Sequence, residues 1–354
     1  EVSTNGQVSG RRNIVINGSQ IVAQRATQVT GIGASGDYFT VDRWTISAAN
    51  TAGRFTMDQS TDTPTGFANS TKLTCTTPDT DIAAGEILQF QTKIEGQDLQ
   101  SLKKGTSDAE KVTVSFYVKG NASATYTCEL HDRDNTRYNG QEFSVTTSWT
   151  RIILTFTGDT TGAFDNDNAV SMSLNFNLHG GSTYTGGTFS SNTWHTTTNQ
   201  RFGDNQTSFF DSTDRTFFIT GVQLEVGSVA TPFEHRSYGE ELALCQRYYY
   251  FRGGGGAASI LGNGGYTANT QVDHIVNFPT TMRAAPSLVQ ASGTNYYNAT
   301  SAGGTDHLDD FVIYGSTIYS ALLYNNSDAS GTAGHYAKFN VAGADGSIAF
   351  NSEL

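Results

Sequence analysis

The chain has 354 residues, 21 of them basic and 33 acidic, which gives a formal net charge of −12. Aromatic residues make up 11% of the sequence, which excludes a disordered chain, and no apolar run approaches the ~20 residues of a membrane-spanning helix. An acidic chain repels phosphates, so nucleic acid is not an expected partner. What remains is a chain low in charge and rich in Gly, Thr and Asn, which favours β-structure without membrane insertion.

The length predicts two domains, at about 100–200 residues for each domain. The three cysteines, Cys75, Cys128 and Cys245, are an odd number without close spacing. We therefore expect buried thiols and no disulfide framework. The sequence begins with Glu1, and we expect a piece of a longer protein with an attachment segment upstream.

Alternation of polar and apolar residues dominates residues 1–236. In Val112–Val118 and Val170–Leu178 every second side chain is apolar, which is typical of an antiparallel strand with one face in the core. Clusters of Asn, Asp and Gly between such runs indicate turns. The pattern predicts a β-sandwich domain. Weaker strands are predicted at Tyr38–Ile46, Leu88–Ile94, Thr125–Leu130, Arg151–Thr157 and Arg215–Val226.

The segment 237–252 follows a helical pattern instead. Ser237 and Glu240 have the spacing of a capping box, and Leu242, Cys245 and Tyr249 fall on one helical stripe. We predict a linker helix here, and its stripe could pack against copies of itself in a homotrimer.

Residues 253–354 are again rich in strand patterns. They predict a second, smaller β-sandwich domain. The fold class expected is therefore all-β, with two β-domains joined by a short helix. The predicted strands are Val272–Phe278, Ser287–Gln290, Phe311–Tyr314, Ile318–Tyr324 and Tyr336–Val341.

Motifs of known enzyme classes do not support catalysis. Gly31–Gly36 matches GxGxxG, but a predicted strand follows it where a dinucleotide site needs a helix. The sequence contains no GxSxG and no HExxH, and its seven histidines are scattered singly. We predict no catalytic residues, and thus a protein that is not an enzyme and needs no cofactor.

Two acidic turns are candidate calcium sites. Asp132–Asn135 and Asp165–Asn168 each place several side-chain oxygens close together, and Ca²⁺ prefers such ligands. The alternative is that these residues form turns without metal, because Asp and Asn favour turns for backbone reasons.

A Gly-rich stretch from His179 to His195 contains aromatic residues without a strand pattern. We expect Tyr184 and Trp194 to be exposed, and together with His195 to stack on a sugar ring and bond its hydroxyl groups. The alternative is that this loop folds back onto its own domain or onto a neighbouring subunit.

Six passages form a set that points to a known family. As a set they resemble bacteriophage tail fibre and virion proteins that carry a carbohydrate-binding-module-like jelly roll. They bracket residues 13–290. The passages are Asn13–Gly18, Val22–Arg25, Tyr38–Trp44, Gly221–Glu234, Tyr238–Tyr249 and Phe278–Pro286.

This resemblance implies a jelly-roll β-sandwich and a place on a virion. It implies a homotrimer, other virion proteins bound through the upstream segment, and host-surface glycan as the ligand. It also implies a structural calcium ion, for which Asp42 and Glu225 are oxygen donors. The sequence departs from the related sugar-binding modules at Thr220–Gly221, where an acidic pair often stands.

Three functions follow as hypotheses. The first is a tail fibre or receptor-binding protein that adheres to cell-surface glycan without chemistry. The second is a capsid-decorating or head-fibre protein. The third is a tail-associated glycan depolymerase.

Overall fold

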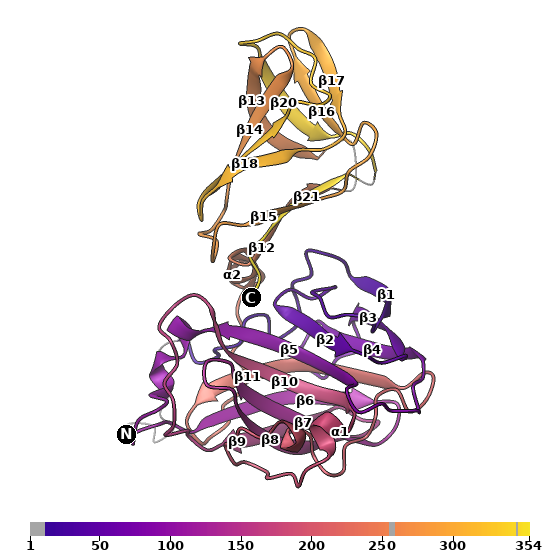
Figure 1. The fold of residues 1–354 in the computed structure, drawn as a ribbon, viewed down its shortest axis with the longest axis vertical. Helices are drawn as coiled ribbons and strands as arrows, with labels where there is room; N and C mark the ends of the chain where they lie inside the picture. Colours follow the sequence, from indigo (N-terminus) through magenta and orange to yellow (C-terminus); the bar gives the residue numbers. More distant parts are fainter. Residues whose placement is uncertain (1–10, 255–258, 345) are drawn as a thin grey trace. The chain divides into compact units, whose positions relative to one another are not determined.

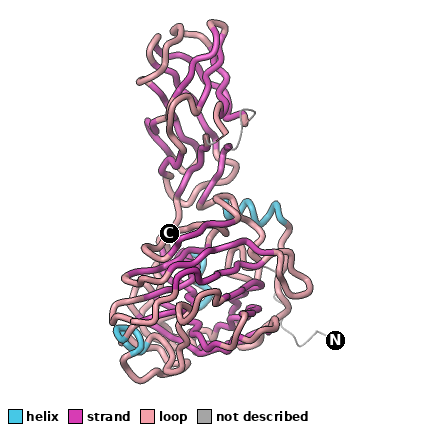
Figure 2. Tube along the Cα trace, turned by 90° about the vertical axis from the view of Figure 1, so that its right-hand side faces the viewer, coloured by secondary structure: helices cyan, strands magenta, loops and turns pink. Residues whose placement is uncertain are grey.

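A computed structural model describes residues 11–254, 259–344 and 346–354. The chain forms two compact units, Glu1–Glu241 with Leu354, and Leu242–Glu353 (Figure 1). Strands and loops make up nearly all of it (Figure 2), so the predicted all-β class is confirmed. Within the described residues, no helix has the length and apolar character needed to cross a bilayer.

The first unit is a jelly-roll sandwich of two antiparallel sheets. Short helices interrupt its loops. The six-stranded sheet has the order β1 (Gln28–Ile32), β3 (Arg54–Ser60), β4 (Ser70–Thr77), β11 (Thr216–Val226), β6 (Val112–Gly120) and β9 (Thr150–Phe156). The five-stranded sheet has the order β2 (Trp44–Ala49), β5 (Ile87–Glu95), β10 (Val170–Gly180), β7 (Ala124–Asp132) and β8 (Arg137–Val145). The short helices are η1 (Gly96–Asp98), η2 (Gln100–Leu102), α1 (Ser182–Thr185) and η3 (Thr198–Gln200).

The core of this unit lies between the inner faces of the two sheets. Phe176 of β10 is fully buried there, with ring centroids 4.9 Å from Phe116 of β6 and 6.2 Å from Trp44 of β2. Trp44 stacks on Phe90 of β5 at 4.7 Å. Such pairs contribute about 0.5–1.5 kcal/mol beyond their buried area. The Phe176–Phe116 pair joins the two sheets, whereas the contacts of Trp44 lie within the five-stranded sheet.

The alternating segments of the sequence form the predicted central strands. Val112–Val118 lies in β6, and Val170–Leu178 lies in β10. The expected strand Tyr38–Ile46 is wrong in its first half, because β2 begins only at Trp44. Arg43, just before it, has a φ of 69°, which an extended strand does not allow.

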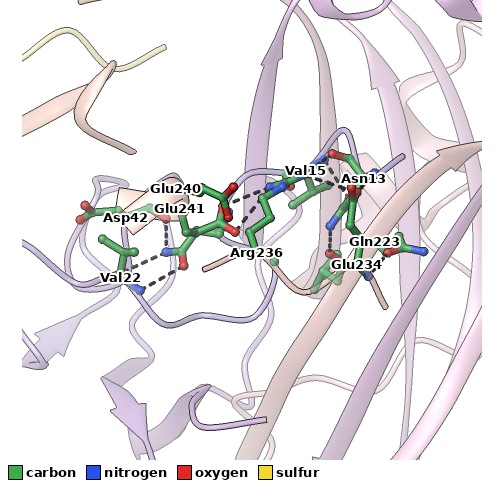
Figure 3. A network of polar contacts seen from close by, with 12 residues as sticks. Asn13, Val15, Val22, Asp42, Gln223, Glu234, Arg236, Glu240 and Glu241 are labelled. Atoms are coloured by element: carbon green, nitrogen blue, oxygen red, sulfur yellow. Dashed lines mark hydrogen bonds and ion pairs between the residues drawn. The ribbon is translucent and has the colours of Figure 1, made fainter. Parts of the chain in front are cut away.

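A polar network fastens the segment before β1 to the chain that follows β11 (Figure 3). The main-chain N of Asn13 donates to Glu234 Oε2 at 2.6 Å. Its side chain bonds β11, because Nδ2 donates to Val222 O and Oδ1 accepts from Leu224 N, both at 3.1 Å. Arg236 Nη2 donates to Asn13 O at 2.5 Å. The opening and closing motifs of the sequence therefore meet in space.

Asn17 is the buried turn residue of the same segment. Its φ is 56°, and its Nδ2 donates to the main-chain oxygens of Val22 and Asp42, both at 2.9 Å. Its Oδ1 accepts from Val22 N at 3.1 Å. Its main-chain N donates to Glu241 Oε1, which also lies 3.2 Å from Arg236. Asn suits this position because it tolerates a left-handed backbone and carries both a donor and an acceptor.

Helix α2 (Tyr238–Gln246) begins with the predicted capping box. Ser237 N donates to Glu240 Oε2 at 2.9 Å, and Glu240 N donates to Ser237 Oγ at 3.3 Å. The predicted extent of 237–252 is wrong at its end, because Tyr249 already belongs to a strand. Leu242, Cys245 and Tyr249 therefore do not share one helix. The division between the two compact units falls inside α2.

The second unit contains two antiparallel sheets around its own core. The run of four glycines Gly253–Gly256 predicts a hinge or a tight passage of the chain. Gly253 and Gly254 continue a strand, whereas Gly255 and Gly256 lie outside the described residues. The small sheet has the order β12 (Tyr249–Gly254), β21 (Ser347–Asn351) and β15 (Ser287–Gln290). The large sheet has the order β17 (Gly304–Leu308), β16 (Tyr297–Ser301), β20 (Tyr336–Val341), β13 (Ile260–Ala268), β14 (Gln271–Asn277), β19 (Ser320–Asn325) and β18 (Val312–Ser316).

The three cysteines are all free and buried, as the sequence predicts. Burial raises the pKa of the Cys75 thiol to about 11, which keeps that thiol protonated and unreactive at neutral pH.

Replacing Asn17 tests the hydrogen bonds that its side chain makes to Val22 and Asp42. The Asn17→Ala variant removes the buried side-chain hydrogen bonds to Val22 N, Val22 O and Asp42 O, so we expect a loss of about 2–3 kcal/mol in the free energy of unfolding. Asn295→Ala is the matched control, because Asn295 is exposed and has a φ of 62°. Urea unfolding measures both. Equal losses would mean that backbone strain explains the effect and the buried hydrogen bonds do not.

Candidate functional site

The aromatic loop between β10 and β11 is half-buried, so the predicted exposure of Tyr184 and Trp194 is wrong. Tyr184, on α1, stacks on Phe202 with ring centroids 5.5 Å apart. Trp194 packs against the core, and its Nε1 donates to Thr157 O at 2.7 Å. His195 pairs through its main chain with Tyr138 of β8. The loop thus folds back onto its own domain, which was the stated alternative.

Tyr184 and His195 both lie near the pair formed by Tyr138 and Arg201, whereas Trp194 does not. The Arg201 guanidinium lies 4.4 Å from the centre of the Tyr138 ring and 5.7 Å from that of Tyr184. The His195 ring is 5.9 Å from the Tyr138 ring. Trp194 instead has a lysine ammonium near its ring. A sugar contact by Tyr184, Trp194 and His195 stays a prediction.

The ammonium group near Trp194 belongs to Lys104, whose side chain is 4% exposed. Its Nζ lies 2.6 Å from Asp132 Oδ2 and 3.2 Å from Asp159 Oδ2. It also donates to the main-chain oxygens of Thr161 and Gly162, at 2.7 and 2.6 Å. Four oxygens thus surround one positive charge, as they would surround a metal cation.

This ammonium occupies one of the two places where the sequence predicts calcium. Asp132 opens the turn Asp132–Asn135, and Asp134 Oδ2 of that turn accepts from Asp165 N at 3.0 Å, so the two candidate turns lie side by side. Burial raises the pKa of Asp159, but hydrogen bonds from Arg137, Thr161 and Lys104 outweigh it and hold this pKa below its usual value. The turn Asp132–Asn135 thus has the Lys104 ammonium beside its first carboxylate, and calcium binding at Asp165–Asn168 stays a prediction.

The carboxylates of Asp42 and Glu225 each accept hydrogen bonds from protein groups, and calcium binding by this pair stays a prediction. Asp42 is fully buried and accepts from Gln24 N at 3.1 Å and from Arg25 Nη1 at 3.4 Å. Glu225 accepts from Thr231 N at 2.9 Å and from Thr231 Oγ1 at 2.7 Å. Within the described ranges, no group of three or more His, Cys, Asp or Glu side chains could hold a metal ion.

The outer face of the five-stranded sheet is polar across its whole width. The inner face of β10 carries Leu174 and Phe176 in the core, so its intervening residues point outward. Strand register aligns these with outward residues of the other strands in three rows, and none has an aliphatic side chain. In the order of the sheet, the rows are Thr45, Gln91, Asn175, Glu129 and Gly140; Ser47, Gln89, Asn177, Thr127 and Glu142; and Lys93, Ser173, His131 and Tyr138.

Several buried atoms on this face lack hydrogen-bond partners. Asn175 and Asn177 are fully buried, yet Asn175 Oδ1 and Asn177 Nδ2 are unpartnered. The same holds for Ser171 Oγ and for His131 Nδ1. Leaving such a group unsatisfied costs about 1–3 kcal/mol. Atoms of this kind indicate a place where a ligand or ordered water completes the bonding.

An open cleft of about 290 Å³ lies at the β2 and β5 side of this face. Its size is near the lower end, about 300 Å³, of the range for small-ligand sites. Tyr38 is half-buried here, and the Arg25 guanidinium lies 5.2 Å from the centre of its ring. Tyr38 OH donates to the main-chain oxygen of Leu354 at 3.2 Å. The lining residues are Gly36, Asp37, Tyr38, Thr45, Ile46, Ser47, Ala48, Gln91 and Lys93.

The opposite side of the face is held by a buried ion pair. Arg201 Nε and Nη2 bind the two oxygens of Glu129, both at 2.8 Å, and Asn175 Nδ2 donates to Glu129 at 2.7 Å. Burial raises the pKa of Glu129, but Arg201 outweighs it and keeps this pKa below its usual value. The bidentate geometry fixes the covering loop on the sheet.

A Ser–His–Glu chain lies at the end of β10. His179 Nδ1 is 2.8 Å from Ser208 Oγ, and His179 Nε2 is 2.9 Å from Glu86 Oε2. This order of groups occurs in hydrolase triads. Here the imidazole is fully buried beside Phe210, whose main-chain N donates to Ser208 Oγ at 3.0 Å. The three groups bind one another and the backbone, which fastens the loop to β10.

Comparisons with known proteins give likenesses of fold only. No family model matches the sequence, and no curated protein matches it. Similar solved structures are carbohydrate-binding modules. A family 4 module is 14% identical, with 59% of this chain and 97% of that chain covered and a TM-score of 0.32. A family 11 module of a Clostridium thermocellum cellulase is 13% identical, with 55% of this chain and 91% of that chain covered and a TM-score of 0.28.

A third such structure is the N-terminal cellulose-binding domain of a Cellulomonas fimi β-1,4-glucanase. It is 12% identical, with 52% of this chain and 90% of that chain covered and a TM-score of 0.29. At these values we transfer no residue role to this chain.

Sequence reasoning missed the polar face and the cleft. The alternation in Val170–Leu178 was a usable signal, because it marked one polar side of a central strand. The register that aligns it with β5 and β7 could not be read from the sequence.

Removing the Lys104 ammonium should destabilise the first unit. Lys104→Met leaves Asp132 and Asp159 buried without this partner, so we expect a loss of about 3–5 kcal/mol in the free energy of unfolding. Lys103→Met is the control, because Lys103 is exposed and pairs with Glu110 at the surface. Denaturant unfolding of both variants provides the comparison. A loss no larger than that of the control would show that the cage adds nothing to stability.

Buried His131 predicts a loss of stability in acid. Burial, together with nearby Arg133, lowers the pKa of His131 to about 3 from 6.5. Between these values the unfolded chain binds a proton that the folded chain does not, so stability decreases as the pH falls from about 6.5 towards 3. His131→Gln should flatten this part of the profile of melting temperature against pH. His235→Gln, at an exposed position, should not. An unchanged slope in His131→Gln would contradict the assignment.

Proposed function

We propose that this chain is a non-catalytic glycan-binding protein, and that it binds on the polar outer face of the five-stranded sheet. The observation that supports this most strongly is the set of three polar rows, fixed by strand register. The fold alone gives no reason for this face to carry Asn175 and Asn177, two buried side chains that each have an amide atom without a hydrogen-bond partner. The cleft gives a ligand with many hydroxyl groups access to the edge of these rows, at Thr45, Ser47 and Gln91.

The chemistry of the cleft suits a sugar. Each hydroxyl group of a sugar both donates and accepts, and each side-chain amide also offers both functions. Gln91 supplies an amide and Ser47 a hydroxyl group within the cleft. Tyr38 adds a ring on which the apolar face of a sugar can stack. Asp37 accepts hydrogen bonds at the rim.

A place on a virion is the finer part of the proposal. It is supported by the resemblance of the sequence motifs to phage tail fibre and virion proteins. The chain would then form a homotrimer, bind other virion proteins through an upstream segment, and adhere to glycan on the host surface. A capsid-decorating or head-fibre role is the alternative. Antibody labelling of intact virions separates a tail position from a capsid position.

Glycan binding is tested by removing the cleft's aromatic ring. We expect Tyr38→Ala to weaken binding by about 10- to 100-fold, because stacking and the shape of the cleft are lost together. A glycan array identifies the ligand, and titration calorimetry measures the affinity. Tyr117→Ala is the control, since Tyr117 is a half-buried tyrosine of β6 in the other sheet.

Two results would contradict this proposal. Failure of the wild-type protein to bind any glycan would remove the function, and equal loss in both tyrosine variants would remove the cleft as its site. New reducing ends after incubation with a bound polysaccharide would favour a depolymerase. In that case Ser208→Ala would test the buried Ser–His–Glu chain.

A further inference from the structure

One cation on the polar face has no carboxylate partner. Arg133 follows β7 directly and is exposed. Its Nε donates to Ser173 Oγ at 3.1 Å and its Nη2 to Gln91 Oε1 at 3.2 Å. Both partners are neutral. Among the described residues, no ion pair involves Arg133, whereas Arg201 on the same face is neutralised by Glu129.

These two bonds fix the position of the Arg133 guanidinium. The Arg133 side chain extends from the end of β7 across β10 to Gln91 of β5. Gln91 in turn lines the open cleft. An arginine has five N–H donors, so three remain beyond the two bonds to Ser173 and Gln91. Lys93 lines the same cleft. The ammonium of Lys93 donates to the main-chain oxygen of Leu354 at 2.5 Å, and Asp37 also lines the cleft. Arg133 is therefore the cation beside this cleft whose side chain is bonded to neutral groups.

The surroundings of Arg133 leave its charge uncompensated. Although the residue as a whole is exposed, desolvation of its guanidinium against the sheet and the neighbouring Arg201 lower its pKa, and Glu129 counteracts them only in part. The group still stays protonated at neutral pH, because an arginine side chain keeps its charge in proteins. An anion placed beside Arg133 would relieve this charge and would be attracted from a distance.

We propose that the ligand of this face is an acidic glycan, and that Arg133 binds the carboxylate of a uronic or sialic acid residue. This inference rests on the proposed glycan-binding function and names its substrate class. The planar guanidinium matches a carboxylate through two parallel hydrogen bonds. The stacked ring of Tyr38 and the amide of Gln91 would hold the neutral part of the sugar. Arg133 is therefore a specificity-determining residue.

The test compares each acidic glycan with its own methyl ester. The ester keeps the sugar and removes the charge. Wild-type protein is first applied to an array of sialylated, uronate-containing and neutral glycans. For each acidic ligand that binds, we expect the methyl ester to bind about 10- to 100-fold more weakly. Raising the salt concentration should weaken binding of the acid and leave that of the ester unchanged.

Variants at Arg133 then assign the effect to this residue. Arg133→Gln should lower affinity for the acid by about the same factor and leave the ester unaffected, while Arg133→Lys should retain part of it. Arg151→Gln is the matched control, because Arg151 of β9 also donates to a serine hydroxyl, Ser115 Oγ at 3.3 Å, on the other sheet. Melting temperatures verify that each variant is folded.

The outcomes separate this inference from the function on which it rests. Binding of neutral glycans as strongly as acidic ones, with no effect of Arg133→Gln, would overturn the inference and leave glycan binding intact. Equal effects of Arg133→Gln and Arg151→Gln would also overturn it. Absence of binding to every glycan would contradict the proposed function itself.

Discussion

The alternation of side chains along β10 constrains both the stability and the surface of the first unit. Because successive residues of a strand point to opposite faces, Phe176 enters the core only if Asn175 and Asn177 face outward. Pairing with β5 and β7 then aligns polar residues of neighbouring strands beside them. A shift of the register by one residue would expose the aromatic core and bury the amides in it. One pattern therefore determines the interior and the candidate site together.

The sequence predicted the strands that alternate strongly, the capping box of α2 and the free cysteines. It failed where the structure depends on contacts between distant segments. The Lys104 cage draws its oxygens from Asp132, Asp159, Thr161 and Gly162, and no spacing in the sequence marks them as neighbours. The aromatic loop was expected to be exposed because it has no strand period. It packs on the sheet instead, since Arg201 binds Glu129 at the far side of the polar rows.

The network around Asn13 and Asn17 gives a physical reason for one sequence resemblance. The opening passage Asn13–Gly18 and the closing passage Gly221–Glu234 are about two hundred residues apart, a separation at which loop closure costs entropy. Their contact is made by Asn13 bonding β11 and Glu234, and by Arg236 bonding the opening passage. The motifs are thus two halves of one buried polar contact. They report on how the sandwich is closed, and none of the residues in this contact lines the cleft.

The polar face is costly for a protein that has only to fold. Buried amide atoms without partners destabilise a fold by about 1–3 kcal/mol each, and an apolar outer face covered by the loop would avoid that cost. Beside these amides, and within the described residues, the exposed cation Arg133 bonds the neutral side chains of Ser173 and Gln91. Sites that break the local rules of folding in this way tend to be functional. A hydroxylated and negatively charged ligand would satisfy the amides and the cation at once. Neutral sugar alone would satisfy only the amides, which is why the charge of Arg133, more than the polarity of the sheet, points to an acidic glycan.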